Sequence, residues 1–211
     1  MTAAYPMPVP SSAKPVGGLG RLVAVARAAR RETATLLRRH GLDRTPARSA
    51  DEYEARWNRQ QQAARWLSVA DISQAPGLSS YGQAQLRALM EFGVFDISAP
   101  AFFTWRGRKI AHVVSQHAEP SSPVVELGCG LGKNLIALAA SGFTNLGGLD
   151  VTPSAVCAVR RQFAHFGIEC DARLGDLLDL GPSRDFLHGK TLFTNYVLEQ
   201  LPRDLTTALT E

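Results

Sequence analysis

The feature that most constrains this chain is a short apolar run that breaks into closely spaced glycines. Residues 124–132 read Val-Val-Glu-Leu-Gly-Cys-Gly-Leu-Gly, with three glycines two positions apart behind an acidic residue. A run of this kind is typical of a buried strand, and glycines let the backbone turn sharply and let a ligand lie against it. The helix expected over residues 133–140 would direct its N-terminal amides at the same ligand. The sequence therefore predicts a nucleotide-type cofactor loop.

The spacing of the glycines distinguishes between cofactors. The dinucleotide fingerprint G-x-G-x-x-G requires glycine at position 133, where this chain has Lys133. Glu126 at the end of the strand would repel a pyrophosphate. S-adenosylmethionine has no phosphate and carries an ammonium and a sulfonium, so a carboxylate at this point favours it. The loop therefore suits a methyl donor better than it suits NAD.

The chain divides at a short Pro- and Ser-containing linker, residues 117–123. Ahead of it we expect a disordered tail over residues 1–18 and a helical region over 19–117. Behind it, over 118–211, strands alternate with helices, a pattern that indicates an α/β fold with a parallel sheet. The helices expected in the first region cover residues 19–40, 49–67, 81–92 and 105–117. In the second region, strands are expected at 124–127, 145–149, 168–174 and 191–196, with helices at 132–141, 152–167 and from 201 onward.

Composition argues against several classes of protein. No apolar run reaches the roughly 18 residues of a membrane span. Three cysteines without metal-ligand spacing favour reduced thiols in a cytoplasmic protein and no metal site. Eight arginines fall between Arg21 and Arg48. Such a cluster is either the solvated face of a helix or an electrostatic footprint for nucleic acid, and we favour the solvated face.

Two acidic residues stand at the ends of the next two expected strands. Asp150 follows the second strand and could accept both hydroxyls of a ribose that lies across the strand ends. Asp176 follows the third strand and could accept the adenine amino group, with the backbone amide of Leu177 beside a ring nitrogen. For both acids a turn is the alternative role. Asp171 or Asp179 would replace Asp176 in a different strand register.

The fourth expected strand ends in the polar residues Thr-Asn-Tyr at 194–196, beside the glycine loop. Small polar groups there could hold the methionyl end of the donor. Tyr196 and Glu199 could face the acceptor and are weak catalytic candidates, because a tyrosine near a strand end is more often a packing residue. Cys129 is expected to contribute its backbone to the loop and not to act as a nucleophile.

Together these residues resemble the class I S-adenosylmethionine-dependent methyltransferase family over roughly residues 120–211. The resemblance implies a Rossmann-like doubly wound sheet of seven strands with helices on both faces. It implies that Glu126 and the loop backbone hold the methionine moiety, that Asp150 holds the ribose and that Asn195 lies near the sulfonium. The cofactor-binding residues that it implies are Glu126, Gly128, Cys129, Gly130, Gly132, Asp150, Val151, Asp176, Leu177 and Asn195.

Two departures from the family pattern stand out. Residues 198–200 read Leu-Glu-Gln where many small-molecule members have Leu-Glu-His, so an imidazole base is absent from that position. Strands five to seven have no counterpart, and the last helix lacks a cap. We therefore expect a chain truncated after strand four, and a partner that supplies the remainder is the alternative.

The function expected is S-adenosylmethionine-dependent methyl transfer to an oxygen or nitrogen of a small-molecule acceptor, with the helical region 19–117 as a substrate cap. One alternative is an RNA or other nucleic-acid methyltransferase, although residues 195–198 are not the Asn/Asp-Pro-Pro-aromatic motif of enzymes that methylate base amino groups. Another is a non-catalytic methyltransferase-like binding domain, and the chain could be an incomplete, inactive fragment. The acceptor, the methylated atom, the general base and the oligomeric state stay open.

Overall fold

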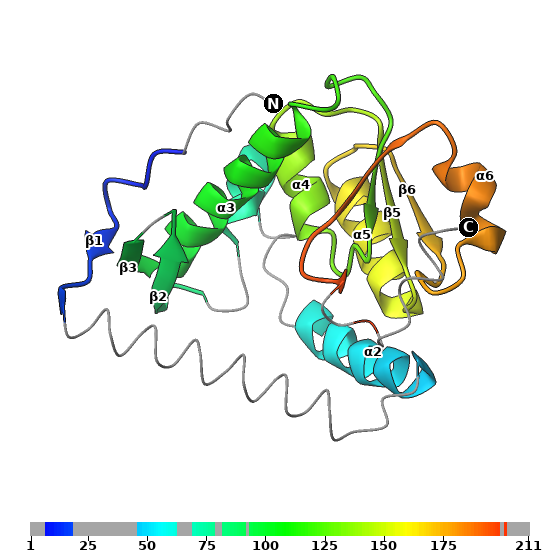
Figure 1. Cartoon of the computed structure of the whole chain (residues 1–211), viewed down its shortest axis with the longest axis horizontal. Helices are drawn as coiled ribbons and strands as arrows, with labels where there is room; N and C mark the ends of the chain where they lie inside the picture. The colour runs from blue at the N-terminus through cyan, green and yellow to red at the C-terminus, as the bar shows by residue number, and fades with distance from the viewer. Residues whose placement is uncertain are drawn as a thin grey trace.

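The computed structural model describes residues 7–18, 46–62, 69–78, 82–91, 93–198 and 201. Within these residues the chain forms two sheets, one of three strands in the order β1-β3-β2 and one of four strands in the order β6-β5-β4-β7. Helix α3 lies between the small sheet and the large one (Figure 1). The large sheet carries the glycine loop and is the frame of the candidate site.

The large sheet is parallel throughout. Its strands are β4 (Val124–Leu127), β5 (Leu146–Asp150), β6 (Cys170–Leu174) and β7 (Thr191–Thr194). β4 pairs with β5 and β7, and β5 pairs with β6. Helix α4 (Lys133–Ala140) connects β4 to β5, and α5 (Pro153–His165) connects β5 to β6. Strand–helix–strand crossovers of this kind are the units of a doubly wound sheet, so the predicted Rossmann-like fold is confirmed.

Both faces of the two central strands, β4 and β5, are buried, which explains the continuous apolar runs in these strands. Val124 and Leu146 pack on one face with residues of α3 (Ala99–Val114), α4 and α5. Val125 and Leu149 pack on the other face with Phe186 of α6 (Arg184–Leu187), which follows the 3-10 turn η3 (Gly181–Ser183). Successive strand residues point to opposite faces, so each strand needs apolar residues at consecutive positions.

The elements of the large sheet begin and end within two residues of the predicted bounds. Two helices ahead of it start earlier than expected: α2 spans Pro46–Gln62, and α3 begins at Ala99. Proline stands in the first turn of both, where its missing N–H leaves no helical bond unmade. The expected helices at 19–40 and from 201 onward lie outside the described residues.

The helix predicted over residues 81–92 is wrong. The chain forms an antiparallel hairpin there, with β2 (Gln85–Met90) paired to β3 (Gly93–Ser98). Burial alternates along β2, because Met90 is buried while Leu89 is 73% exposed. That period of two belongs to a strand with one solvated face.

A strand also replaces part of the disordered tail expected over residues 1–18. Strand β1 (Lys14–Pro15) pairs with the free edge of β3, and the amide of Val16 donates to the carbonyl oxygen of Val94 at 2.9 Å. Val9 and Ala13 pack against the apolar cluster around Met90. An open strand edge has backbone groups to satisfy, and this segment satisfies them.

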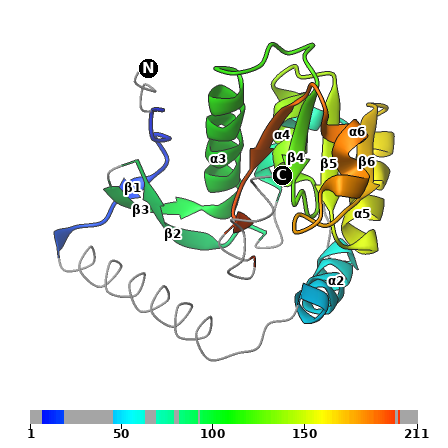
Figure 2. The ribbon, with the colours of Figure 1, turned by 45° about the vertical axis from the view of Figure 1, so that its right-hand side comes forward.

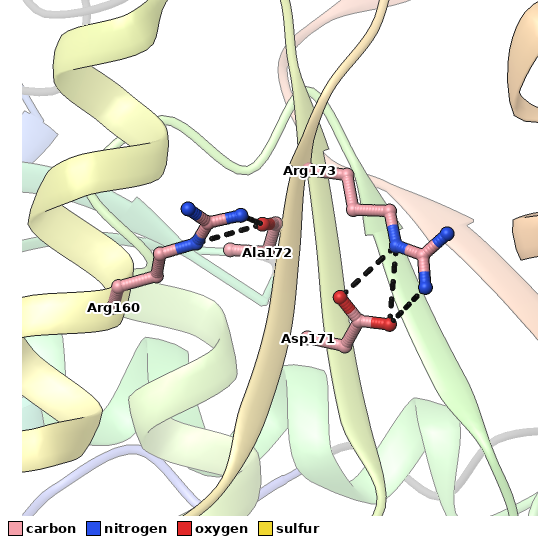
Figure 3. Close-up of polar contacts among 4 residues, drawn as sticks. All are labelled: Arg160, Asp171, Ala172 and Arg173. Carbon is pink, nitrogen blue, oxygen red and sulfur yellow. Dashed lines mark hydrogen bonds and ion pairs between the residues drawn. The ribbon is translucent and has the colours of Figure 1, made fainter.

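The outer edge of the described parallel sheet, strand β6, carries charged side chains (Figure 3). Two guanidinium nitrogens of Arg160, on α5, donate to the carbonyl oxygen of Ala172 at 3.1 and 2.6 Å. Arg173 pairs with Asp171 at 2.7 Å, and its hydrogen bonds lower the pKa of that carboxyl. A satisfied carbonyl and flanking charges make this edge a poor template for another strand.

Helices α3 and α4 meet at a glycine, which gives a test of their packing. A Cβ on Gly107 would lie 2.8 Å from the Cβ of Ala137. We expect Gly107→Ala to lower the free energy of unfolding by about 1–3 kcal/mol, because the overlap outweighs the roughly 1 kcal/mol that alanine gains in helix propensity. Urea denaturation measures the change. Gly17→Ala, where a Cβ meets nothing within 4 Å, is the matched control, and a G107A chain as stable as the parent would contradict the prediction.

Candidate functional site

A cavity of about 430 Å³ opens at the carboxyl ends of the parallel strands. The loops that follow β4, β5, β6 and β7 form its floor, and residues of α2 and α3 form its other walls. Figures 1 and 2 show α2 lying across this end of the sheet. The cavity lies where the strand order reverses, between β4 and β7, which is the usual place for a ligand in an open α/β sheet. Its volume is that of a small-molecule site.

The cavity brings together nearly all the residues singled out from the sequence. The predicted cofactor residues that line it are Glu126, Gly128, Cys129, Gly130, Asp150, Val151, Asp176, Leu177 and Asn195, and Tyr196 lines it as well. Gly132 does not line it. This residue is instead the N-cap of α4, and a Cβ there would meet the side chain of Val159 at 2.8 Å. Glu199 and the following glutamine lie outside the described residues.

The glycine loop adopts a conformation that other residues rarely take. Gly128, Gly130 and Gly132 have φ angles of 70°, 49° and 69°, all in the left-handed region that favours glycine. The side chain of Trp57, on α2, lies 3.0 Å from the position of a Cβ on Gly130. The loop therefore presents bare backbone to the cavity, with an aromatic ring beside it.

Glu126 is a buried carboxylate with an unused oxygen. The residue is 1% exposed, and its Oε1 accepts a hydrogen bond from the side-chain amide of Asn134. Its Oε2 has no hydrogen-bond partner among the residues that the structure describes. Burial raises the pKa of Glu126 to about 8, while the hydrogen bond from Asn134 and the charge of Arg106 act in the opposite direction. A buried acceptor without a partner is unusual and marks a place for a donor or a cation.

Asp150 ties the glycine loop to the end of β5. Its Oδ2 accepts from the amide of Gly130 at 2.8 Å, and its Oδ1 accepts from the amide and the hydroxyl of Thr152 at 3.0 and 2.7 Å. The residue is 7% exposed, and burial raises its pKa against the effect of these hydrogen bonds. Because Oδ2 has only one partner, it keeps an acceptor position for a ligand hydroxyl.

Asp176 occupies a turn and also lines the cavity. Its Oδ1 accepts from the amide of Leu178 at 2.9 Å, so the turn that was the alternative role is present. The same carboxylate retains a second oxygen. Asp171, the alternative for this role, pairs instead with Arg173 outside the cavity.

The segment after β7 contributes an amide and a strained tyrosine. The side-chain nitrogen of Asn195 is buried and has no hydrogen-bond partner among the described residues. Tyr196 is 67% exposed and has a φ of 59°, which is uncommon for a bulky residue. The guanidinium of Arg106 lies 4.9 Å from the centre of the Tyr196 ring. Strain of this kind often occurs at binding sites.

Sequence reasoning expected the helical region to be a cap but did not identify the side chains that it contributes to the cavity walls. Three cations line the cavity, and each lies over an aromatic ring: Arg56 over Trp57 at 5.2 Å, Arg106 over Tyr196, and Lys133 over Phe103 at 5.4 Å. Spacing along the chain indicates only a helical face for Trp57. Its place beside the loop depends on tertiary packing.

A carboxylate of α2 connects that helix to α5. The Oε2 of Glu54 accepts from the backbone amide of Ser154, in the first turn of α5, at 3.1 Å. A carboxylate is stabilised near a helix N-terminus because the amides there have no helical partner. This hydrogen bond is one of the contacts with α5 that hold α2, and with it Arg56 and Trp57, over the glycine loop.

The structure also bears on the sequence features that concern metals, membranes and the arginine cluster. Among the described residues there is no cluster of three or more potential metal ligands, and no helix is long and apolar enough to span a membrane. The side chains of the arginine cluster from Arg21 to Arg48 lie outside the described part of the chain.

Comparison with known proteins gives a family for the second half of the chain. Residues 124–211 match the model of a methyltransferase domain. No curated protein sequence matches the chain.

Several solved structures are similar to the chain over part of its length. One structure comes from work on the conversion of a disulfide bond into a thioacetal group during echinomycin biosynthesis. It is 24% identical to this chain with a TM-score of 0.40, and the match covers 48% of this chain and 42% of the other protein. Magnesium protoporphyrin IX methyltransferase from Synechocystis PCC 6803, with bound SAH, is 20% identical with a TM-score of 0.35, over 63% of this chain and 52% of its own. A tRNA (uracil-54, C5)-methyltransferase from Pyrococcus abyssi is 20% identical with a TM-score of 0.30, and the match covers 46% of this chain and 25% of that protein.

The chain thus spans about half or less of the length of these proteins. The family assignment rests on the matched domain model and on the glycine loop, parallel sheet and cavity described above. Residues 124–211 thus match a methyltransferase domain, and their loop, parallel sheet and cavity are consistent with the class I S-adenosylmethionine-dependent methyltransferase fold.

Proposed function

We propose that this chain binds S-adenosylmethionine in the cavity and directs methyl transfer to an oxygen or nitrogen of a small-molecule acceptor. The observation that carries this proposal is the free, buried oxygen of Glu126 beside the left-handed glycine loop. A ligand that fits both must bring a cation to the carboxylate and lie flat against the backbone. The methionyl end of the cofactor has an ammonium group that meets the first requirement.

The other residues of the cavity suit the remaining parts of the cofactor. Asp150 has an acceptor position for a ribose hydroxyl, with Val151 beside it. Asp176 and Leu177 line the cavity and suit the adenine, and the buried side-chain nitrogen of Asn195, which has no partner among the described residues, suits the methionyl end. Arg106, the cation whose charge reaches Glu126, suits the methionyl carboxylate.

When bound, the cofactor supplies an electrophilic methyl group on its sulfonium. The chain's own residues provide the setting for the transfer. The aromatic side chains of α2 and α3 narrow the cavity and exclude water, and the cavity walls hold the acceptor in line for attack. An acceptor hydroxyl needs a base. Tyr196 faces the cavity and remains a candidate, as does Glu199.

Calorimetric titration with S-adenosylhomocysteine tests the proposal. We expect one molecule to bind per chain and NAD to give no heat of binding, because Lys133 stands where the dinucleotide loop requires glycine. S-adenosylhomocysteine keeps the ammonium, the carboxylate, the ribose and the adenine, so it probes every contact above. Binding of NAD without binding of S-adenosylhomocysteine would overturn the proposal.

A further inference from the structure

Positive charge is concentrated in the cavity beyond what the cofactor site explains. Arg56 of α2, Arg106 of α3 and Lys133 of α4 all line it, and none forms an ion pair with a carboxylate among the described residues. The charges of Arg106 and Arg56 lower the pKa of Lys133, after the larger effect of burial. Three elements therefore hold three cations close enough to repel one another.

The carboxylates of the same cavity accept hydrogen bonds from other groups and form no ion pair with these cations among the described residues. Asp150 is engaged by Gly130 and Thr152, and Asp176 by the amide of Leu178. Glu126 has a pKa of about 8 and so is largely protonated at neutral pH before a ligand binds. Like charges in a partly buried site are unfavourable unless a counter-ion joins them.

The proposed cofactor accounts for only one of the three cations. Its single carboxylate suits Arg106, the cation that interacts with Glu126. Arg56, exposed at the rim, and Lys133, half-buried at the start of α4, are left without an anionic partner. Lys133 is also a cation at a helix N-terminus, which is the unfavourable end of the helix dipole, so an anion there is stabilised by both groups.

Aromatic rings lie beneath these two cations. Arg56 lies over Trp57 and Lys133 over Phe103, and both rings belong to residues that line the cavity. The rings fix the cations in place and offer an apolar wall for the body of a ligand. We propose that the acceptor is a small molecule with an apolar, planar body and an anionic group, a carboxylate or a phosphate, that binds between Arg56 and Lys133. This inference rests on the proposed function for the identity of the acceptor.

Matched probes test the anionic group. We would measure binding of 4-hydroxybenzoate, phenyl phosphate and the neutral 4-hydroxybenzamide by calorimetry, with and without saturating S-adenosylhomocysteine. We expect at least one of the anions to bind about tenfold more tightly than the amide, the size of a charge-assisted contact. Whichever anion binds more tightly identifies the group. Binding of all three probes within about twofold would overturn the inference.

Substitutions of the two cations test whether they are the source of the preference for an anion over the neutral amide. Arg56→Gln and Lys133→Gln should each reduce the ratio of anion to amide affinity about tenfold, and Arg56→Lys should restore part of it. Arg59→Gln, also an exposed arginine of α2 but outside the cavity, is the matched control and should keep the ratio. A preference that survives in both glutamine variants would overturn the inference.

The two proposals fail in different ways. If S-adenosylhomocysteine binds and the anions show no preference, the acceptor inference is wrong and the proposed function stands. If the anions are preferred and S-adenosylhomocysteine does not bind, the anion site stands while the methyltransferase proposal falls. If neither result is obtained, both are wrong.

Discussion

Replacing Asp150 with alanine should abolish measurable binding of S-adenosylhomocysteine. The carboxylate accepts a hydrogen bond from the Gly130 amide, and it offers an acceptor position to the ribose of the ligand. We expect the dissociation constant to rise at least about 100-fold, which corresponds to roughly 2.7 kcal/mol. Titration calorimetry, at a temperature below the midpoint of thermal unfolding of the variant, measures this dissociation constant.

The same substitution should weaken the fold. The amides of Gly130 and Thr152 lose their acceptor in a buried place, and each unsatisfied group costs about 1–3 kcal/mol. Circular dichroism separates loss of binding from loss of structure. Asp171→Ala is the control, because it removes an exposed carboxylate that pairs with Arg173 outside the cavity, and its effect should stay within about 1 kcal/mol. Wild-type affinity in the Asp150→Ala chain would show that the ribose lies elsewhere.

The part of the site that could be predicted from the sequence is the part made by neighbouring residues. The glycines that follow β4 need left-handed backbone angles, and that need is visible as glycine itself. Asp150 and Asp176 follow buried strands, and parallel strands end at one edge of a sheet, so their convergence follows from the strand pattern. Whether Asp176 serves a turn or a ligand could not be decided, because one carboxylate can do both.

The part that could not be predicted depends on packing between distant segments. Nothing in the local sequence of α2 indicates that Glu54 contacts the first turn of α5, a hundred residues away. That hydrogen bond is one of the contacts with α5 that place Arg56 and Trp57 at the cavity. The hairpin of β2 and β3 was not predicted for a different reason. Leu86, Leu89 and Met90 are spaced as on one face of a helix, and only the pairing of β2 with β3 favours a strand.

The substitution Glu126→Gln should change both stability and binding in a way that depends on pH. The pKa of this carboxyl rises from an ordinary 4.5 to about 8 because the folded chain buries it. Its neutral form is therefore favoured by folding, and the stability that it contributes is fully present below pH 4.5 and is lost as the pH rises through 8. The free energy of unfolding of the parent chain should fall by about 1.4 kcal/mol per pH unit in this window, relative to the variant, or about 5 kcal/mol in all.

Urea denaturation of both proteins from pH 5 to pH 8 measures this difference. Asp150, whose pKa burial also raises, is present in both chains, so the difference between them reports Glu126 together with its electrostatic interaction with Asp150. Glu119→Gln, which changes an exposed glutamate, is the control and should follow the parent. Equal pH dependence in the parent and the Glu126→Gln chain would contradict the buried carboxyl as its source.

Binding provides an independent measure of the same proton. If the ionised carboxylate holds the ammonium of the ligand, Glu126 must lose its proton when S-adenosylhomocysteine binds near neutral pH. Calorimetry in buffers of different ionisation enthalpy should then show release of about one proton per molecule bound at pH 7, and affinity should rise up to about tenfold per pH unit from pH 6 to 7. The Glu126→Gln chain should bind weakly, release no proton and show no such rise. Proton release of the same size in the variant would mean that another group faces the ammonium, and the free oxygen of Glu126 would then need a different ligand.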